Sequence, residues 1–291
     1  MTHVHSETHP PEPPGAKRRV REEANAYTYI ADLVYQRCGI RLHHGKEELI
    51  TSRLGKRMRK HGLSGLMQYV EFLQTQADEQ EFREVIDALT TNFTSFMREG
   101  THFQHLVGKA LPSLLRPNQR TFRIWSAACS SGEEPYTIAF HLAESYPLTS
   151  GWDWRLTATD ISKRVLEHAQ RGTYAADRLS AVPREWLPKY FQRGVGSWEG
   201  HYRVKPIIAE RIAFGQLNLI EPYEHSVVFE VIFCRNVMIY FDRPTQERLV
   251  QQLCRFLVPG GYLFTGHAES LNGLQLPLRY MSPSIYRKES P

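Results

Sequence analysis

The sequence lacks the features that mark several large classes of proteins. No apolar run in its 291 residues approaches the roughly 18 residues that a membrane-spanning helix requires. The four cysteines stand far apart, without a Cys-x-x-Cys pair or a zinc-type spacing, which favours a reduced, cytoplasmic protein. Residues 1–22 are polar and proline-rich without an apolar segment, so we expect a disordered tail rather than a signal peptide.

Sequence motifs of several reaction classes are missing as well. We find no Ser-His-Asp set, no metal-ligand cluster and no obvious catalytic base. The loop after residue 127 has one glycine, Gly132, where dinucleotide-binding loops have Gly-x-Gly-x-x-Gly, which disfavours a nicotinamide-dependent oxidoreductase. The Asn/Asp-Pro-Pro-Tyr/Phe loop expected for amino-group methylation is absent, which disfavours a DNA or RNA methyltransferase.

The residues that are present divide the chain into two parts. Apolar side chains recur at helical spacing over residues 23–90, which predicts a small all-helical N-terminal domain. Within it, Ser64 is the expected N-cap of the helix that follows it. A linker and a helix are expected over residues 91–120. Strand-like and helical segments alternate over residues 121–291, which predicts an α/β fold with a mostly parallel, doubly wound sheet.

Segment boundaries in the α/β part follow from apolar runs and turn residues. Strands are expected at 122–127, 155–159, 212–214, 227–234 and 262–266, and helices at 135–144, 165–171 and 245–257. Pro259-Gly260-Gly261 predicts a tight turn before the last of these strands, and residues 284–288 favour a final edge strand. The rhythm breaks over residues 173–211, where two short runs around a Gly-x-Gly turn predict a small inserted β-subdomain.

A segment of small residues between a strand and a helix is the most informative feature of the chain. The strand runs into Ala128-Cys-Ser-Ser-Gly132, and Glu133, Glu134 and Pro135 then open a helix. Backbone N–H groups and the positive helix end lie there, at the edge where α/β folds bind nucleotide-like ligands. Two carboxylates would repel phosphate and favour a ligand with a positive charge and hydroxyl groups, such as S-adenosylmethionine. An ordinary strand–turn–helix whose carboxylates complement the helix dipole is the alternative.

Polar residues at the ends of two further strands extend this candidate site. Asp160 ends a strand, where an acidic residue can accept hydrogen bonds from both ribose hydroxyls; alternatively, it caps the helix that follows. Arg235 and Asn236 stand directly after a buried strand and before a second apolar run, so a purely structural role is disfavoured.

In combination, these segments resemble the CheR family, S-adenosylmethionine-dependent methyltransferases that esterify glutamates on bacterial chemoreceptors. The resemblance covers roughly residues 27–287 and rests on Ala88-Leu-Thr-Thr-Asn-Phe-Thr-Ser-Phe96 with Arg98, Trp125-Ser-Ala-Ala-Cys-Ser-Ser-Gly-Glu-Glu-Pro-Tyr136, Ala158-Thr-Asp160, Asn218-Leu219, Ile232-Phe-Cys-Arg-Asn-Val-Met-Ile-Tyr-Phe-Asp242 and Gly266-His-Ala-Glu-Ser270. Cys129 stands where the family usually has a small residue such as alanine, and Met97 where it often has phenylalanine. The implied fold is a Rossmann-like methyltransferase domain behind the helical domain.

The resemblance also implies a set of cofactor-binding residues. They are Asn92, Thr94, Arg98, Glu134, Asp160, Asn218, Leu219, Arg235 and Asn236. Asp160 would meet the ribose hydroxyls, and Asn218 with Leu219 would flank the adenine. The alternatives are that Asn92 and Thr94 merely cap a helix and that Asn218 is only a turn residue.

The reaction of the family explains why no catalytic base is recognisable. A glutamate is already ionised near pH 7, so its attack on the sulfonium methyl group depends on positioning and charge. By the resemblance, Glu134 meets the methionine or ribose portion, Arg98 steers the incoming carboxylate, and Tyr240 hydrogen-bonds near the methyl group. The implied function is protein-glutamate O-methylation in sensory adaptation, with S-adenosylhomocysteine as product. A non-catalytic module that binds either compound as a signal is the alternative.

A basic stripe predicts an acidic partner. Residues 41–60 contain seven Lys and Arg and only two Glu. Arg53, Lys56, Arg57 and Lys60 share one helix face, which would attract an acidic helix through a field that salt screens. The resemblance implies the cytoplasmic helical domain of methyl-accepting chemoreceptors as that partner; a solvated face is the alternative. Nucleic acid is not expected, because no aromatic side chains interleave the basic ones.

The β-subdomain suggests a second contact with the receptor. In some members of the family, this subdomain adds a peptide from the receptor C-terminus as a further strand. The turn at Gly194 and Gly196 resembles that version, although a plain hairpin turn explains the glycines nearly as well. The protein is therefore expected in the cytoplasm, recruited to membrane receptor arrays without inserting into the membrane.

Overall fold

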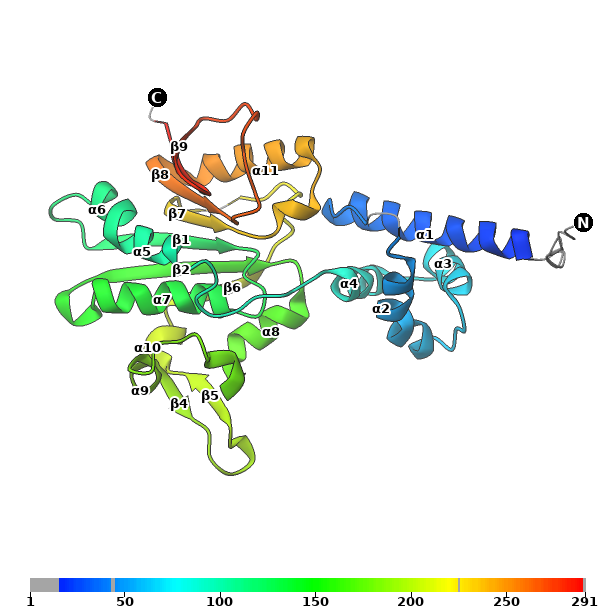
Figure 1. The fold of residues 1–291 in the computed structure, drawn as a ribbon, viewed down its shortest axis with the longest axis horizontal. Coiled ribbons are helices and arrows are strands. Elements are labelled where there is room, and N and C mark those ends of the chain that lie inside the picture. The colour runs from blue at the N-terminus through cyan, green and yellow to red at the C-terminus, as the bar shows by residue number, and fades with distance from the viewer. Residues whose placement is uncertain (1–15, 43–44, 225, 290–291) are drawn as a thin grey trace, which may run out of the picture. The chain divides into compact units, whose positions relative to one another are not determined.

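The computed structural model describes residues 16–42, 45–224 and 226–289 (Figure 1). They form two units: a helical unit of residues up to 37 and 42–89, and an α/β unit of residues 38–41 and 90 onward. The predicted tail lies mostly outside the described residues, and the first helix begins at Ala16, before the expected boundary. No helix in the described part of the chain combines the length and the apolar character needed to cross a membrane.

The described residues of the helical unit form four helices, because apolar side chains recur on one face of each. Their bounds are α1 Ala16–Cys38, α2 Glu47–Lys60, α3 Leu66–Thr75 and α4 Glu79–Leu89. Ile50 and Leu54 are buried along α2, as their spacing predicts. The N-cap prediction for Ser64 is wrong: Gly65 takes that position, and the Ser64 hydroxyl donates to Gln68 Oε1 at 3.0 Å.

The α/β unit is built on a seven-stranded sheet, which confirms the predicted fold class. Its strands are β1 Thr121–Ala127, β2 Asp153–Asp160, β6 Ile212–Gln216, β7 Phe229–Cys234, β8 Leu257–Thr265, β9 Leu278–Ser282 and β10 Ile285–Lys288. They lie in the order β6-β2-β1-β7-β8-β10-β9; the first five are parallel, and β10 is antiparallel to both neighbours. The direction of winding reverses at β1, and folds of this type bind ligands at the carboxyl edge beside such a reversal.

Both faces of the sheet are covered, because its central strands are apolar on both sides. On β7, Val231 and Phe233 join one core cluster, whereas Ile232 and Cys234 join the other. Helices α7 Glu133–Ser145 and α8 Lys163–Arg171 lie on the first face, and α11 Arg243–Phe256 lies on the second (Figure 1). The sequence predicts all three helices.

Two details of the sheet differ from expectation. Residues 259–261 are no separate turn: β8 runs through them, with a register shift against β7 that Gly260 accommodates at φ +75°. A last antiparallel strand exists, but β9 lies outside β10 and takes the edge. A glycine pair suits a bulge as well as a turn, so the sequence does not separate the two.

The predicted β-subdomain is a separate antiparallel sheet in the order β3-β5-β4. Its elements are β3 Thr173–Ala175, α9 Trp186–Tyr190, β4 Phe191–Arg193, β5 His201–Val204 and α10 Pro206–Ala209. Only glycine fits at position 194, because a Cβ of Gly194 would lie 2.1 Å from the Trp198 carbonyl oxygen. Gly196 has a φ of +60°, so turn geometry accounts for both glycines.

Residues 90–100 form an irregular segment of the α/β unit. It leads into α5 Thr101–His105, a π-helical turn Leu106–Ala110 and α6 Leu111–Leu114. Phe96 anchors the segment: its ring is buried and meets the Tyr174 ring edge-on, with centroids 4.9 Å apart. The polar residues on either side of Phe96 are thereby held against the rest of the unit.

Candidate active site

A cavity lies at the carboxyl edge of the parallel strands, where the strand order predicts a ligand site. It encloses about 910 Å³, counting space open to solvent. Its walls come from the segments after β1, β2, β6 and β7, from the segment 90–98, and from Cys38 and Ile40.

The structure brings every predicted cofactor-binding and catalytic residue to this cavity. Its walls include Asn92, Thr94, Arg98, Glu134, Asp160, Asn218, Leu219, Arg235, Asn236 and Tyr240. These residues come from five separate segments of the chain, so the strand topology is what assembles them. The contact that each makes with a ligand stays a prediction.

Sequence reasoning misses part of the site. Cys38, Ile40 and Phe103 line the cavity, although each has the pattern of an ordinary apolar core residue. Cys38 is a thiol at neutral pH, because burial raises its pKa to about 11. Glu99 is missed too, and its position directly after Arg98 was the available signal.

The loop between β1 and α7, which contributes Ala128 and Ser130 to the cavity wall, adopts strained backbone conformations. Ala128 and Ser130 have φ values of +66° and +49°, which cost a non-glycine residue about 1–2 kcal/mol. Gly132 has a φ of +96°, and a Cβ there would lie 2.8 Å from both Ala169 Cβ and the Tyr174 hydroxyl. The backbone path therefore requires the small residues, whether or not a ligand also does.

The main chain fixes Asp160 at the cavity wall. Its Oδ2 accepts from the Ser130 N–H at 2.8 Å, and its Oδ1 accepts from the Ser162 N–H at 3.0 Å. The interpretation of Asp160 as a helix cap is wrong, because Ser162 is the N-cap of α8. A carboxylate offers about four acceptor sites, so these two bonds are compatible with a role in binding ribose hydroxyls.

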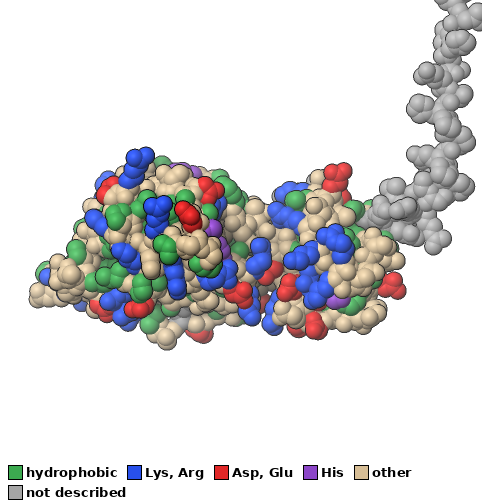
Figure 2. Space-filling model, turned by 90° about the horizontal axis from the view of Figure 1, so that it is seen from below, with side chains coloured by type: hydrophobic (Ala, Val, Ile, Leu, Met, Phe, Trp, Pro, Cys, Tyr) green, Lys and Arg blue, Asp and Glu red, His purple; other side chains and the backbone are tan. Residues whose placement is uncertain are grey.

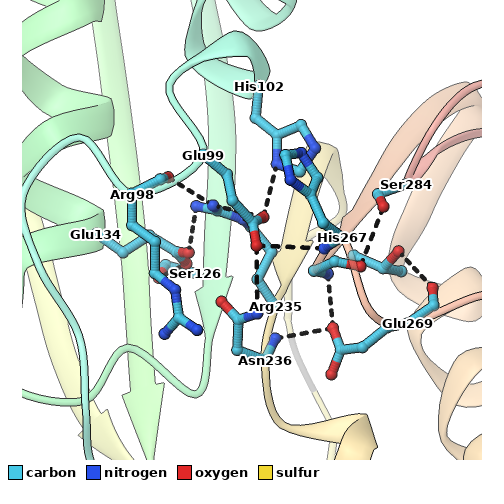
Figure 3. Close-up of polar contacts among 12 residues, drawn as sticks. Arg98, Glu99, His102, Ser126, Glu134, Arg235, Asn236, His267, Glu269 and Ser284 are labelled. Carbon is cyan, nitrogen blue, oxygen red and sulfur yellow. Dashed lines mark hydrogen bonds and ion pairs between the residues drawn. The ribbon is translucent and has the colours of Figure 1, made fainter.

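Arg235, which lines the cavity, connects the carboxylates of Glu134 and Glu99 (Figure 3). Its Nη1 donates to Glu134 Oε2 at 2.9 Å, while its Nη2 donates to Glu99 Oε2 at 2.8 Å and to the Arg98 carbonyl at 2.6 Å. The side chain is 1% exposed, and its guanidinium carbon lies 5.3 Å from the centre of the Phe103 ring. These contacts engage the guanidinium within the protein, so Arg235 shapes the pocket more than it reaches into it.

The two carboxylates of this cluster respond differently to burial. Burial raises the pKa of Glu134, although Arg235 and the Ser126 hydroxyl, which donates to Oε1 at 2.7 Å, act in the opposite direction. Burial also opposes ionisation of Glu99, but hydrogen bonds from Arg235 and the His267 N–H outweigh it and lower the pKa. The Glu99 carboxylate is therefore ionised at neutral pH. The pKa of Glu134 depends on the balance between burial, which raises it, and Arg235 and Ser126, which lower it.

A third carboxylate, Glu269, holds the turn after β7. Its Oε2 accepts from the N–H groups of Asn236 at 2.8 Å and Gly266 at 2.6 Å. Asn236 has a φ of +59°, and these bonds compensate its backbone strain. The Asn236 amide also donates to Glu99 Oε1 at 3.4 Å, so two carboxylates orient this residue at the cavity (Figure 3).

Glu99, His102 and His267 form the one group of described residues whose ligand atoms, all within 4.8 Å of one another, could hold a metal ion. Burial and the charge of Arg235 lower the pKa of His102 to about 4, so its ring is neutral at pH 7. Both oxygens of Glu99 already accept hydrogen bonds, and the Arg235 guanidinium beside them would repel a cation. The group is better described as a polar cluster of the pocket wall.

The linker forms one side of the cavity and is tied to the neighbouring loop and subdomain. The Asn92 carbonyl accepts from the Ser130 hydroxyl at 2.9 Å, and the Thr94 carbonyl accepts from Arg178 Nη2 at 2.8 Å. Neither Asn92 nor Thr94 caps a helix, because the next helix, α5, has Gly100 at its N-cap position. The helix-cap interpretation of these two residues is therefore wrong.

Asn218 and Arg98 both line the cavity, and their side chains make different contacts. Asn218 is a turn residue, as the alternative proposes, since its amide donates to Glu221 Oε1 at 2.7 Å, and it lines the cavity as well. Arg98 donates to the Phe93 carbonyl at 3.0 Å, and in Figure 3 its guanidinium extends away from the Arg235 contacts. Arg98 therefore contributes positive charge to the cavity.

The residues of the wall suit S-adenosylmethionine better than a ligand with phosphate groups. Glu134 and Asp160 contribute carboxylates, which match hydroxyl groups and a positive charge. Glu133 does not take part, because it is 1% exposed and paired with Arg178. Leu219 and its neighbours add apolar surface of the kind that an adenine ring requires.

The basic stripe on α2 is smaller than the sequence predicts. Arg57 is 13% exposed, and its Nε donates to Glu81 Oε1 at 3.1 Å, so its charge is neutralised within the helical unit. Arg53 donates to a main-chain carbonyl of α4 at 2.7 Å, while Lys56 and Lys60 are exposed. Figure 2 shows basic side chains on the helical unit with acidic ones between them.

Comparisons with known proteins match both units of the chain. Residues 92–286 match the SAM-binding domain of CheR methyltransferase, and residues 25–90 match its all-alpha domain. The chain is 39% identical over 258 residues to the chemotaxis protein methyltransferase of Salmonella typhimurium, covering 88% of each. It is 38% identical over 264 residues to chemotaxis protein methyltransferase 2 of Pseudomonas aeruginosa, covering 89% of this chain and 91% of that protein.

Among solved structures, PKMT2 from Rickettsia typhi in complex with AdoHcy matches 60% of this chain and 26% of its own, with a TM-score of 0.36 and 16% identity.

The two family domains follow one another here as a helical unit and an α/β unit. The similarity to the curated relatives extends over nearly the whole chain. The chain therefore belongs to the CheR family of S-adenosylmethionine-dependent chemotaxis methyltransferases.

Proposed function

We propose that the protein transfers the methyl group of S-adenosylmethionine to glutamate side chains of methyl-accepting chemoreceptors, with S-adenosylhomocysteine as the second product. The observation that carries this proposal is the position of Arg98 and Tyr240 in the wall of the same cavity as Glu134 and Asp160. A cation and a phenol beside a cofactor pocket suit an incoming carboxylate. The names of the relatives support a substrate in chemotaxis.

The proposed reaction needs positioning and charge more than proton transfer. When bound, the cofactor supplies an electrophilic methyl group on a positively charged sulfur. A glutamate with an ordinary pKa is ionised at neutral pH and needs no base, which fits a cavity wall without histidine among the described residues. Arg98 would attract and orient this carboxylate, and Tyr240 would hydrogen-bond beside it. Asp160 and Glu134 would hold the cofactor.

We further propose that α2 guides the helical domain of the receptor to the enzyme. Lys56 and Lys60 are exposed on this helix, with Arg59 next to them. An acidic receptor helix would be attracted to such a face, and the attraction would weaken as salt increases. Arg57 is left out of this surface because of its pairing with Glu81. These contacts would take place in the cytoplasm, where receptor arrays would recruit the enzyme.

A C-terminal peptide of the receptor would bind at the β-subdomain. Strand β4 is an edge of that sheet, and a peptide added to it would gain main-chain hydrogen bonds. Val195 and Trp198 are 81% and 59% exposed and line a groove beside β4, together with Tyr202. Gly194 and Gly196 would act indirectly, because they shape the turn that presents these side chains.

The test is a transfer assay with S-adenosylmethionine labelled in its methyl group and a cytoplasmic fragment of a chemoreceptor. We expect label on the fragment that mild base releases as methanol, as glutamate methyl esters do. Arg98→Ala should lower the transfer rate at least about tenfold, whereas Arg184→Ala, a change at an exposed arginine outside the cavity, should not.

Two results would contradict the proposal. Label that resists base would mean that a different atom is methylated. Tight cofactor binding without any transfer to receptor fragments would instead favour the non-catalytic signalling module.

A further inference from the structure

Phe93 lies at the opening of the cavity. Its side chain lines the cavity and is 72% exposed, more than the rings of Trp198 at 59% and Tyr280 at 56%. Phe96, three residues later, is buried and anchors the same segment in the core. A single exposed apolar side chain needs no function, so the surroundings of Phe93 decide whether its ring has a role.

The backbone around Phe93 is fixed by side chains of the α/β unit. The main-chain carbonyls of residues 92, 93 and 94 accept hydrogen bonds from Ser130 Oγ at 2.9 Å, Arg98 Nη1 at 3.0 Å and Arg178 Nη2 at 2.8 Å. None of these bonds involves the Phe93 side chain. The ring is therefore held at the opening without being covered, and a partner that covers it gains apolar contact without having to order the backbone.

Arg98, which would orient the incoming carboxylate, lies directly beside this ring. Its guanidinium carbon is 5.9 Å from the centre of the Phe93 ring. On a helix, residues three or four positions apart lie on one face, with their Cβ atoms about 5–6 Å from each other. A helix that presents a glutamate to Arg98 would therefore place a residue one turn away over Phe93.

We propose that Phe93 is a substrate-binding residue that packs against an apolar side chain one helical turn from the methylated glutamate. This role rests on the function proposed above and makes its substrate more specific. Arg98 would repel a cation over the ring, and a second carboxylate there would compete for Arg98. An apolar side chain has neither effect and gains free energy by covering the ring. The contact would select the glutamates that have such a neighbour.

The experiment is the transfer assay at saturating S-adenosylmethionine, with the concentration of the receptor fragment varied. For Phe93→Ser, we expect kcat/KM for the fragment to fall about tenfold, mainly through a higher KM, because the ring would act in binding. Phe93→Leu keeps an apolar side chain and should restore most of the value. Each variant retains the main-chain carbonyl at position 93, so the contact with Arg98 is preserved.

Ile207→Ser is the matched control. Ile207 is 57% exposed on α10 and does not line the cavity. The change removes another exposed apolar side chain from the α/β unit and should leave kcat and KM unaltered. Calorimetric titration of Phe93→Ser with S-adenosylmethionine should give an affinity within about twofold of that of the unaltered protein, which shows that the cavity is intact.

A change in the receptor fragment identifies the partner of the ring. Apolar residues three or four positions from the methylated glutamate are replaced by serine, one at a time. At one of these positions, kcat/KM should fall about fivefold with the unaltered protein and remain nearly the same with Phe93→Ser. The two effects should not add, because the contact that the serine removes is already absent from the variant.

The outcomes separate this role from the proposed function. Base-labile label with the same KM for Phe93→Ser and the unaltered protein would overturn the role of Phe93 and leave the function intact. Weaker cofactor binding by Phe93→Ser would also overturn it, since the ring would then belong to the cofactor site. Additive effects at every receptor position would exclude the proposed contact. No transfer by the unaltered protein would overturn the role and the function together.

Discussion

Each unit of the protein buries an arginine against carboxylates, and the two clusters differ in what the carboxylates face. In the helical unit, burial opposes ionisation of Glu81, but hydrogen bonds from Arg57 and Tyr69 outweigh it and lower the pKa to about 2. In the α/β unit, burial prevails and raises the pKa of Glu134 despite its bond to Arg235. Donors of the protein enclose the first carboxylate, whereas the second lines a cavity.

The comparison shows how one set of residue types serves two purposes. A buried charge whose hydrogen bonds are all made within the protein orders the packing around it. A buried charge at the wall of a cavity is shifted in pKa and keeps capacity for a ligand, which is typical of functional sites. The four predictions that follow test this contrast, from the largest expected effect to the smallest.

Asp160→Ala should strongly weaken cofactor binding in the cavity. The change removes the acceptor for the Ser130 and Ser162 N–H groups and the expected partner of the ribose. Binding of both S-adenosylmethionine and S-adenosylhomocysteine should weaken at least about hundredfold, because hydrogen bonds to a charged group contribute about 1.5–3 kcal/mol each. Calorimetric titration checks this, with Asp153→Ala at the exposed start of the same strand as control. Binding within threefold of the unaltered protein would contradict the assigned site.

Arg57→Met should destabilise the helical unit without touching cofactor binding. Glu81 would keep its charge in a buried position and lose its main donor, at a cost of about 3 kcal/mol. Cofactor affinity should not change, since no cavity residue belongs to the helical unit. Thermal unfolding measures the first effect, and Arg59→Met, at the exposed neighbouring position, is the control. An unchanged unfolding midpoint would mean that the buried Arg57–Glu81 pair contributes nothing to the stability of the helical unit.

As pH falls, the α/β unit should lose stability before the helical unit does. The folded pKa of His102 is about 4, below its ordinary 6.5, so its contribution to stability is complete above pH 6.5 and is lost as pH falls toward 4. Glu81 shifts from 4.5 to about 2, so its contribution is lost only between those lower values. Hydrogen exchange at a series of pH values should therefore show the α/β unit opening first.

The variant His102→Leu sharpens this test. It should reduce the loss of stability between pH 6.5 and 4 by about 2 kcal/mol, because the group that must stay neutral is gone. His201→Leu, a change in the β-subdomain, should leave the profile as it is. If the helical unit opened before the α/β unit as pH falls, the proposed difference between the Arg57–Glu81 cluster and the Arg235–Glu134 cluster would be contradicted.

The smallest effect is expected at the surface of α2. Lys56→Glu combined with Lys60→Glu should lower the rate constant for receptor methylation a few-fold at low salt, because rim charges act on encounter. The difference should disappear near 0.5 M salt, where screening is strong. Lys109→Glu, an exposed change in the α/β unit, controls for net charge. Equal rates at low salt would remove α2 from the proposed docking surface.

Much of the α/β unit is predictable because local patterns and tertiary structure agree there. The apolar run that ends in Phe233 and Cys234 favours a central strand, and in the structure its side chains are buried on both faces of the sheet. The features that escape prediction depend on neighbours distant in sequence. Whether Gly260 ends a turn or bends a strand depends on the register of β7, which the local sequence does not contain.

The two-part organisation, the parallel sheet and the polar residues of the cavity wall follow from the sequence, whereas apolar wall residues such as Cys38 and Phe103 do not. Periodicity and motif order carry that information, and the strand ends bring the motifs together. The contacts of the charged residues, in contrast, depend on the tertiary structure. It turned Arg57 inward to Glu81, and it placed Glu99 between Arg235 and the main chain. The reason is physical: a charge acts according to the burial and partners around it, and these come from distant segments.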